Sequence, residues 1–444
     1  MTRSPQSDQA SLSEHVRLRS QLWSNSAGQL AGTIVARVSR AAAILICARL
    51  LGPNLFGQVA TGLATYELLR VLSEAGLDTR LVRHVAQNAA DGFSETARTI
   101  GLKIALAIPL LGAGILFTGV GLGWQESVVV LALSVGLPGI ATAGSVQATA
   151  TARLDARALI PYQAIAGLVY FTIVTAIAAK LRAPISAALG IGMGDLLGSM
   201  AFLVYLHRAS RGERAASGWS WPQWEWLRES WPVAAVNILA TTYARLGVWF
   251  LAVQWGTSSV AQYGVSYRVI EVFLIASAAV GSSAFAVTAR LEKKSEQGEA
   301  EGLLVHIVGR VVWALVLLVA AVITAAFFLP DLLGVEYAPA AGVTRVLACA
   351  LPPMFLNGLL TANLYGRGRY RTVLRIAALN LVVNVGLLIG LVPAWGPPGV
   401  AVAVLITEAL NTALQARAAG LSPRSPPFLM AVFSLSLGLL LFFY

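Results

Sequence analysis

The chain has 444 residues, of which 57% are hydrophobic and only 12% are charged. A soluble protein of this length would carry about a quarter charged residues, so the composition excludes an ordinary soluble domain. The formal net charge of +11 could suggest nucleic acid as a partner. Most lysines and arginines lie in short loops between apolar runs, however, so no nucleic-acid binding is expected.

Apolar runs of about 20 residues recur along the sequence, and each is long enough to cross a hydrocarbon core of about 30 Å. They predict an all-α polytopic membrane protein with twelve transmembrane helices. The predicted spans, in chain order, are 28–50, 55–77, 99–120, 127–149, 159–180, 185–207, 231–254, 259–287, 304–329, 341–364, 372–393 and 397–418. A thirteenth apolar segment, 428–444, follows the sequence SPRSPP and is a further span, an interfacial segment or a truncated element.

The twelve spans form two bundles of six helices. The expected divisions are a cytoplasmic N-terminal segment at 1–26, a first bundle at 27–207, a cytoplasmic linker rich in tryptophan and arginine at 208–230, a second bundle at 231–418, and a Pro-rich linker with the additional apolar segment at 419–444. The tryptophans of the linker region are expected to anchor it at the level of the lipid headgroups. They are Trp219, Trp221, Trp224, Trp226 and Trp231.

Loop charges predict the orientation in the membrane. If residue 1 lies in the cytoplasm, 23 of the 32 basic residues fall in cytoplasmic segments, including Lys103 just after the third span begins. The opposite side carries only Arg49, Lys180 and Arg182. Cytoplasmic loops are enriched in lysine and arginine, so this bias supports both the number of spans and a cytoplasmic N-terminus.

Cysteine and histidine give no sign of a metal or redox centre. Cys47 and Cys349 both lie inside predicted spans, without a neighbouring cysteine, and are expected to be buried free thiols. The four histidines are far apart and lack the spacing of metal ligands. No metal, cofactor or catalytic residue is therefore expected.

The two halves contain a weak internal repeat. At a shift of 204 residues, GPNLFGQVATGLATYE aligns with GTSSVAQYGVSYRVIE, which places Glu67 on Glu271. The shift later becomes 213 and places Asp195 on Glu408. Six spans in each half give both halves the same orientation, so a pseudo-two-fold axis along the membrane normal is expected to relate them.

Charged residues remain inside the predicted spans after the loops are set aside. The basic ones are Arg37, Arg40, Arg70, Arg245, Arg268 and Arg345, and the acidic ones are Glu67, Glu74, Asp195, Glu271 and Glu408. Each costs about 2.5–3.5 kcal/mol or more at the bilayer centre on insertion scales, so these side chains must face a bundle interior or a water-filled cavity.

Arginines occur on the first, second, seventh and eighth spans, two spans from each half, which predicts one central cavity between the halves. Guanidinium groups bind phosphate oxygens through forked pairs of hydrogen bonds, so an anionic headgroup, especially a pyrophosphate, fits such a cavity. The candidate substrate-binding residues are Arg37, Arg40, Arg70, Arg245 and Arg268.

Helical spacing also permits a purely structural interpretation, in which arginines and glutamates only pair with each other. Arg70 is three and four residues from Glu67 and Glu74, and Arg268 is three residues from Glu271. The five acidic residues, Glu67, Glu74, Glu271, Asp195 and Glu408, are therefore candidates either for ion coupling or for charge pairs. Asp195 also lies among Gly190, Gly194 and Gly198, whose spacing of four predicts a close-packing helix face.

Two long stretches resemble a known family. ARLLGPNLFGQVATGLATYELLRVLSEAGLDTRLVR, residues 48–83, is similar to the opening region of bacterial polysaccharide-unit flippases, with its Leu-Gly-Pro, its Phe-Gly and its acidic residue before Gly-Leu. LYGRGRYRTVLRIAALNLVVNVGLLIGLVPAWGPPGVAVAVLITE, residues 364–408, resembles the region of the tenth to twelfth spans. The wider superfamily, which has the MATE-like fold, also holds multidrug exporters and lipid II flippases.

This resemblance implies two six-helix bundles in a V, working by alternating access in the bacterial cytoplasmic membrane. It implies transport of undecaprenyl-pyrophosphate-linked oligosaccharide units to the outer leaflet for O-antigen or exopolysaccharide synthesis, with a polysaccharide polymerase and chain-length machinery as possible partners. The family's cationic lumen residues would correspond to the five arginines named above.

Two other functions remain open. A cation-coupled exporter of drugs or small molecules would favour an acidic lumen lined by aromatic residues, whereas this one has a surplus of arginine. A membrane glycosyltransferase, polymerase or ligase would need substantial outer loops with catalytic residues, and the predicted outer loops are short and nearly uncharged. A transport function without enzymatic activity is therefore favoured.

Overall fold

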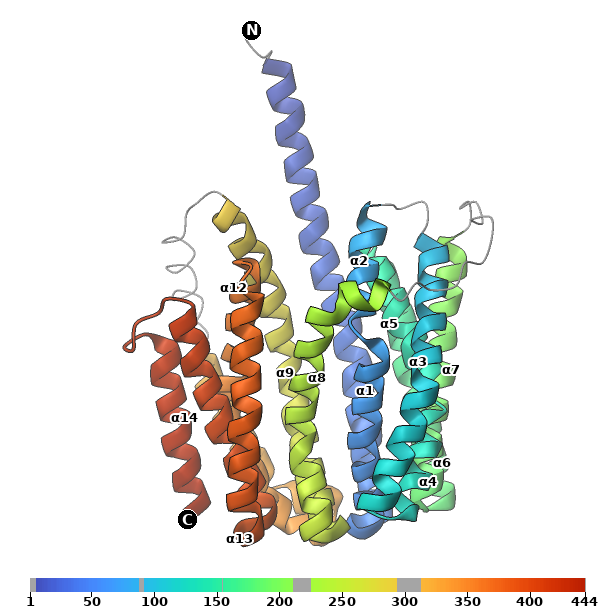
Figure 1. Ribbon diagram of the computed structural model, residues 1–444, viewed down its shortest axis with the longest axis vertical. Helices are drawn as coiled ribbons and strands as arrows, with labels where there is room; N and C mark the ends of the chain where they lie inside the picture. The colour runs from blue at the N-terminus through green and yellow to red at the C-terminus, as the bar shows by residue number, and fades with distance from the viewer. Residues whose placement is uncertain (1–4, 88–91, 154, 211–224, 294–312, 444) are drawn as a thin grey trace.

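The computed structural model describes the backbone of residues 5–87, 92–153, 155–210, 225–293 and 313–443, and side chains from residue 32 to residue 274 and beyond 312 within these ranges. Every regular element in the described part of the chain is a helix. Most of the helices run roughly along one common direction, side by side (Figure 1).

Two of the helices each hold two predicted spans. Helix α1, Pro5–Glu74, bends at Gly52, where φ is +73°, and α13, Tyr370–Ala418, bends at Gly396, where φ is +54°. Glycine accepts a positive φ without steric cost, and in both helices a proline follows and suits the first turn of the next segment. The Leu-Gly-Pro motif is thus a tight link between two spans.

The rest of the first half forms the elements α2 Leu77–Gln87, α3 Gly92–Gly121, α4 Trp124–Ser134, α5 Leu137–Ala152, η2 Ala156–Leu159, α6 Ile160–Leu181 and α7 Pro184–Ala209. The second predicted span ends earlier than expected, because Ala75 and Gly76 both have positive φ and separate α1 from α2. The fourth span is broken, with a bend of 43° between α4 and α5. Gly136 and Pro138 lie at this bend, and a proline suits the first turn of the new helix α5.

The second half contains α8 Glu225–Gln254, α9 Gly256–Lys293, a helix at Trp313–Ala326, α11 Leu329–Leu333, η3 Val335–Tyr337, α12 Ala338–Gly366, α13, and α14 Pro426–Phe443. The predicted ninth span, 304–329, lies partly outside the described residues. The thirteenth segment is a helix that packs on α12 and α13 and is long and apolar enough to cross a membrane. Figure 1 shows it running beside α13.

By length and composition, seven helices in the described part of the chain can cross a membrane, or eight if α4 and α5 count as one broken span. The bent helices α1 and α13 each contain two of the predicted spans, and α9 contains the eighth. The protein is therefore an all-α, multi-pass membrane protein, as its composition predicted.

The helices form two lobes that meet along α1. Helices α3 to α7 pack with α1 in the first lobe, and α8, α9, α12, α13 and α14 pack together in the second. Gly256, at the start of α9, has φ of +75°, close to the value at its repeat partner Gly52. Within the first lobe, Gly194 lies against Tyr170 and Gly198 against Ala166, which confirms the predicted close-packing face of α7.

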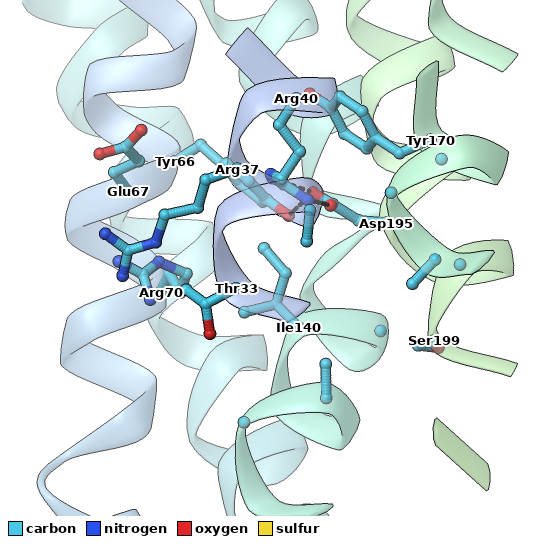
Figure 2. Close-up of a pocket in the computed structure, with 18 of the residues that line it drawn as sticks. Thr33, Arg37, Arg40, Tyr66, Glu67, Arg70, Ile140, Tyr170, Asp195 and Ser199 are labelled. Carbon is cyan, nitrogen blue, oxygen red and sulfur yellow. Dashed lines mark hydrogen bonds and ion pairs between the residues drawn. The ribbon is translucent and has the colours of Figure 1, made fainter. Parts of the chain in front are cut away.

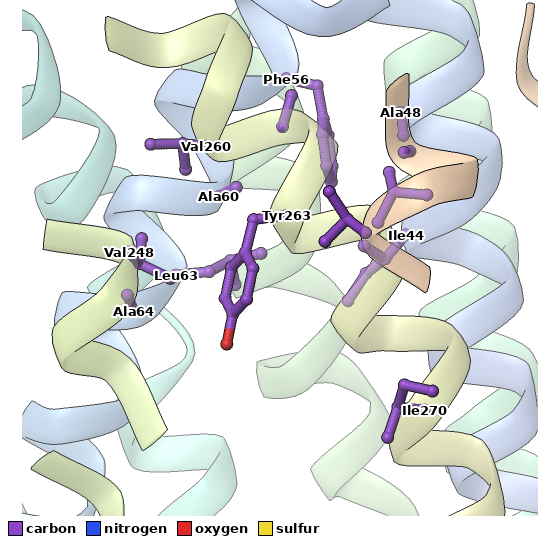
Figure 3. Close-up of a cluster of buried hydrophobic side chains, with 14 of the residues drawn as sticks. Ile44, Ala48, Phe56, Ala60, Leu63, Ala64, Val248, Val260, Tyr263 and Ile270 are labelled. Atoms are coloured by element: carbon purple, nitrogen blue, oxygen red, sulfur yellow. The ribbon is translucent and has the colours of Figure 1, made fainter. Parts of the chain in front are cut away.

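An apolar cluster joins the two lobes where α1 contacts α8 and α9. Figure 3 shows Phe56 and Leu63 of α1 facing Val260 and Tyr263 of α9. The backbones approach so closely that a Cβ on Gly57 would overlap the carbonyl oxygen of Thr257. The lobes are thus sealed against each other along this part of α1.

Candidate functional site

A cavity of about 620 Å³ lies beside this seal, between the first lobe and helices α8 and α9 (Figure 2). Leu63 and Ile44 belong both to its lining and to the apolar cluster. Its charged lining residues are Arg37, Arg40, Arg70, Lys103, Arg245, Arg268, Glu67, Glu74, Asp78, Asp195 and Glu271. The structure therefore brings together all ten predicted site residues except Glu408.

Arg40 is held by a carboxylate of the same lobe. It forms an ion pair with Asp195 of α7, whose side chain is only 1% exposed, and its guanidinium lies 4.2 Å from the ring centroid of Tyr170. The hydroxyl of Tyr66 donates a hydrogen bond to Asp195 Oδ2 at 3.2 Å. Arg40 has no acidic neighbour at helical spacing. Its partner lies 155 residues away in the sequence and is brought close by the packing of the helices. Arg40 is therefore paired within the first lobe.

Four charged side chains form a closed set of ion pairs between the lobes, and we call it the interlobe ring: Glu67 of α1, Arg245 of α8, and Arg268 and Glu271 of α9. Arg268 Nη1 lies 2.6 Å from Glu271 Oε2, and Arg268 Nη2 lies 3.1 Å from Glu67 Oε1. Arg245 Nη2 lies 3.0 Å from Glu271 Oε1 and also pairs with Glu67. Each arginine therefore contacts both carboxylates.

Arg37 and Arg70 differ from the other cavity arginines. The ion pair of Arg70 with Glu74 is long, 3.9 Å between Nη1 and Oε2, and the Arg70 side chain is 37% exposed. No carboxylate in the described part of the chain lies within ion-pair distance of Arg37. Both side chains point to the same side of the cavity in Figure 2. Arg37 and Arg70 therefore lack the close carboxylate partner that each of the other three cavity arginines has.

The sequence analysis missed a second buried pair at the far end of the cavity. Lys103 is buried inside α3, and its ammonium lies 2.5 Å from Asp78 Oδ1, which also accepts a hydrogen bond from Ser145 at 3.2 Å. The pattern of loop charges instead assigns Lys103 to a cytoplasmic segment. Its position within the predicted span 99–120 was the available signal for a buried role.

Glu408 is buried in the second lobe, outside the cavity lining. Its oxygens accept hydrogen bonds from the Tyr243 hydroxyl at 3.0 Å and from Asn357 Nδ2 at 2.6 Å. Its repeat partner Asp195 instead pairs with an arginine. The two aligned carboxylates therefore have different partners in the two lobes.

Two of the five linker tryptophans, Trp226 and Trp231, belong to the described residues. Trp219, Trp221 and Trp224 lie outside them. Trp226 is buried against α2 and α3 of the first lobe, and the guanidinium of Arg80 lies 3.8 Å from its ring centroid. Trp231 is exposed. Anchoring at the lipid headgroups stays a prediction for these residues.

Among the described residues, no cluster of three or more histidine, cysteine or acidic side chains could hold a metal ion. Cys47 and Cys349 are free and buried, as predicted. The described site is thus a charged cavity between two lobes of a multi-pass helical membrane protein.

Comparison with known proteins identifies the family. The sequence pattern of the family described as "Polysaccharide biosynthesis protein" matches residues 22–292, more than half of the chain, and the protein belongs to this family. No curated protein matches the sequence closely enough to count as a relative.

Several solved structures share the fold. The lipid II flippase MurJ, in an inward closed conformation, has a TM-score of 0.72 at 12% identity, over 93% of this chain and 96% of that one. An outward-facing multidrug resistance MATE family transporter of the MOP superfamily has a TM-score of 0.64 at 15% identity, over 94% of this chain and 96% of that one. A MOP superfamily transporter from Pyrococcus furiosus has a TM-score of 0.63 at 15% identity, over 95% of each chain. The MATE-like fold expected from the sequence resemblance is thus confirmed.

Proposed function

We propose that this protein is a flippase that moves undecaprenyl-pyrophosphate-linked oligosaccharide units from the inner to the outer leaflet of a bacterial cytoplasmic membrane. The observation that carries the proposal is the pair Arg37 and Arg70, which face a cavity between the lobes without a close carboxylate partner. These two guanidinium groups suit a phosphate group of a pyrophosphate, because each can bind phosphate oxygens in forked geometry.

The distribution of basic loops supports an inward-facing state. The cavity extends from the interlobe ring towards Asp78, Lys103 and Gln147, at the end of the molecule where the predicted cytoplasmic loops lie. The seal at Gly57 and Thr257 then closes the outer side. In this orientation the pyrophosphate enters from the cytoplasmic leaflet while its lipid tail stays in the bilayer.

A cation-coupled drug exporter fits the cavity less well. Five acidic residues line it, but four of them hold a basic partner within 3.3 Å and only Glu74 has a long contact, at 3.9 Å. Little negative charge is therefore left to attract a cationic drug.

Replacing both Arg37 and Arg70 with alanine tests the proposal. We expect transport to fall by about tenfold or more for each arginine, since each charge-assisted hydrogen bond contributes about 1.5–3 kcal/mol. The measurement is outer-leaflet appearance of a lipid-linked oligosaccharide in vesicles that contain the protein. Arg345→Ala is the matched control, because Arg345 lies outside the cavity lining. Normal transport by the double variant at normal protein levels would refute the proposed function.

A further inference from the structure

The interlobe ring is asymmetric between the lobes. Within it, Glu67 is the contribution of the first lobe, whereas Arg245, Arg268 and Glu271 all belong to the second. In the closed arrangement two positive charges balance two negative ones, with side chains between 12% and 27% exposed. If α1 moved away, the second lobe would keep two guanidinium groups and a single carboxylate.

Such a surplus is unfavourable in a partly dehydrated site, because an uncompensated charge there loses its partner without regaining full hydration. The lobes can therefore part at the ring only if another anion takes the place of the Glu67 carboxylate. Phosphate oxygens bind arginine in the same forked geometry as carboxylate oxygens, so a phosphate is a chemically matched replacement.

Other contacts between the lobes also hold this interface. They include the apolar cluster around Phe56 and Tyr263 and a hydrogen bond from Trp249 Nε1 to Thr65 Oγ1, 3.2 Å long. A further ion pair joins Arg80 Nε to Glu229 Oε2 at 3.3 Å, but neither residue lines the cavity. All four side chains of the ring do line the cavity, so a ligand in the cavity can reach these ion pairs.

We propose that Glu67 is a displaceable lock, which holds the lobes together until a diphosphate replaces it on Arg245 and Arg268. The inference rests on the proposed function and specifies how the substrate class triggers the movement. One phosphate binds first at Arg37 and Arg70 on the accessible side, and the second competes with the Glu67 carboxylate. A neutral or singly charged ligand cannot do both, so the lock also selects for the diphosphate. The ligand shifts the equilibrium because it binds the unlocked state better.

A disulfide across the seal can report whether the lock is closed. A Cβ at Gly264 of α9 would lie 3.4 Å from the Ala60 Cβ of α1, close to the separation of about 3.5–4.5 Å in a disulfide. The reporter carries Ala60→Cys and Gly264→Cys in a full-length background with Cys47→Ala and Cys349→Ala. It is reconstituted in vesicles, and the rate of disulfide formation is measured with and without undecaprenyl pyrophosphate.

We expect undecaprenyl pyrophosphate to slow disulfide formation in the reporter by about fivefold or more. Glu67→Gln, which is nearly isosteric but uncharged, should slow it to a similar extent without ligand and leave little further effect of the ligand. Undecaprenyl phosphate, with a single phosphate, should have a much smaller effect than the diphosphate.

A control inside the first lobe separates unlocking from misfolding. Thr96 and Thr149 lie with their hydroxyl oxygens 2.5 Å apart, so a Thr96→Cys/Thr149→Cys pair reports whether that lobe is folded. It should react equally with and without Glu67→Gln. Unchanged cross-linking of the seal in Glu67→Gln would overturn the lock, as would a ligand effect that persists undiminished in this variant. If either result occurred while transport stayed normal and still depended on Arg37 and Arg70, the lock would be refuted but the proposed flippase function would not.

Discussion

At the scale of single residues, the cavity arginines divide into two kinds. Arg40, Arg245 and Arg268 are held by close carboxylates on other helices, whereas Arg37 and Arg70 have no close carboxylate partner. The paired arginines contribute little net charge to the cavity, because their carboxylates balance them. In the proposed function, Arg37 and Arg70 provide the affinity for an anion.

Asp195→Asn should affect folding more than ligand recognition. It removes the charge that compensates Arg40, so we expect the free energy of unfolding to fall by about 2 kcal/mol. A fully buried pair would lose more, but solvent screens this one because the Arg40 side chain is 38% exposed. Thermal unfolding of the purified protein measures this. Arg40→Ala with Asp195→Ala should recover part of the loss. Equal melting temperatures for Asp195→Asn and the parent would contradict a structural role for the pair.

At the scale of elements, the close approach of α1 and α9 depends on the absence of a side chain at Gly57. Gly57→Ala should force these helices apart at a cost of about 1–3 kcal/mol, and so reduce disulfide formation between cysteines at positions 60 and 264 by about tenfold. Gly112→Ala in α3 is the matched control, because no other group lies within 4 Å of its Cβ position. Equal cross-linking in the two variants would show that the lobes do not close through this contact.

Local sequence patterns predict the helices better than the contacts between them. The links at Gly52 and Gly396 can be predicted from the sequence, because a glycine followed by a proline between two apolar runs is typical of a turn. The break between α4 and α5 was missed, although Gly136 and Pro138 were its signals in the sequence. The close approach of Gly136 to Tyr66 and Asp195, by contrast, follows only from the packing of the helices. The arginines of the cavity are recognisable by their cost in a membrane. Their partners lie up to 201 residues away, and only the packing of the lobes determines them.

At the scale of the whole molecule, the proposed transport moves a net negative charge outward. With an inside-negative potential this gains about 2.3 kcal/mol per charge per 100 mV, so we expect transport in vesicles to accelerate as the potential on the side of the cytoplasmic loops becomes more negative. The transport rate is measured in vesicles whose membrane potential is set with an ionophore. Vesicles in which the potential has been collapsed are the control. A rate independent of the potential would indicate that a cation moves with each diphosphate.

The ring also bears on how such a chain could arise by duplication. In a symmetric dimer of six-helix subunits, the axis would force both copies of every contact to be identical. Here Arg40 pairs with Asp195 of its own lobe, whereas Arg245 reaches across to Glu67 and Glu408 binds Tyr243 instead of an arginine. A single polypeptide that contains both halves permits such unequal contacts, whereas a symmetric dimer of identical subunits would not.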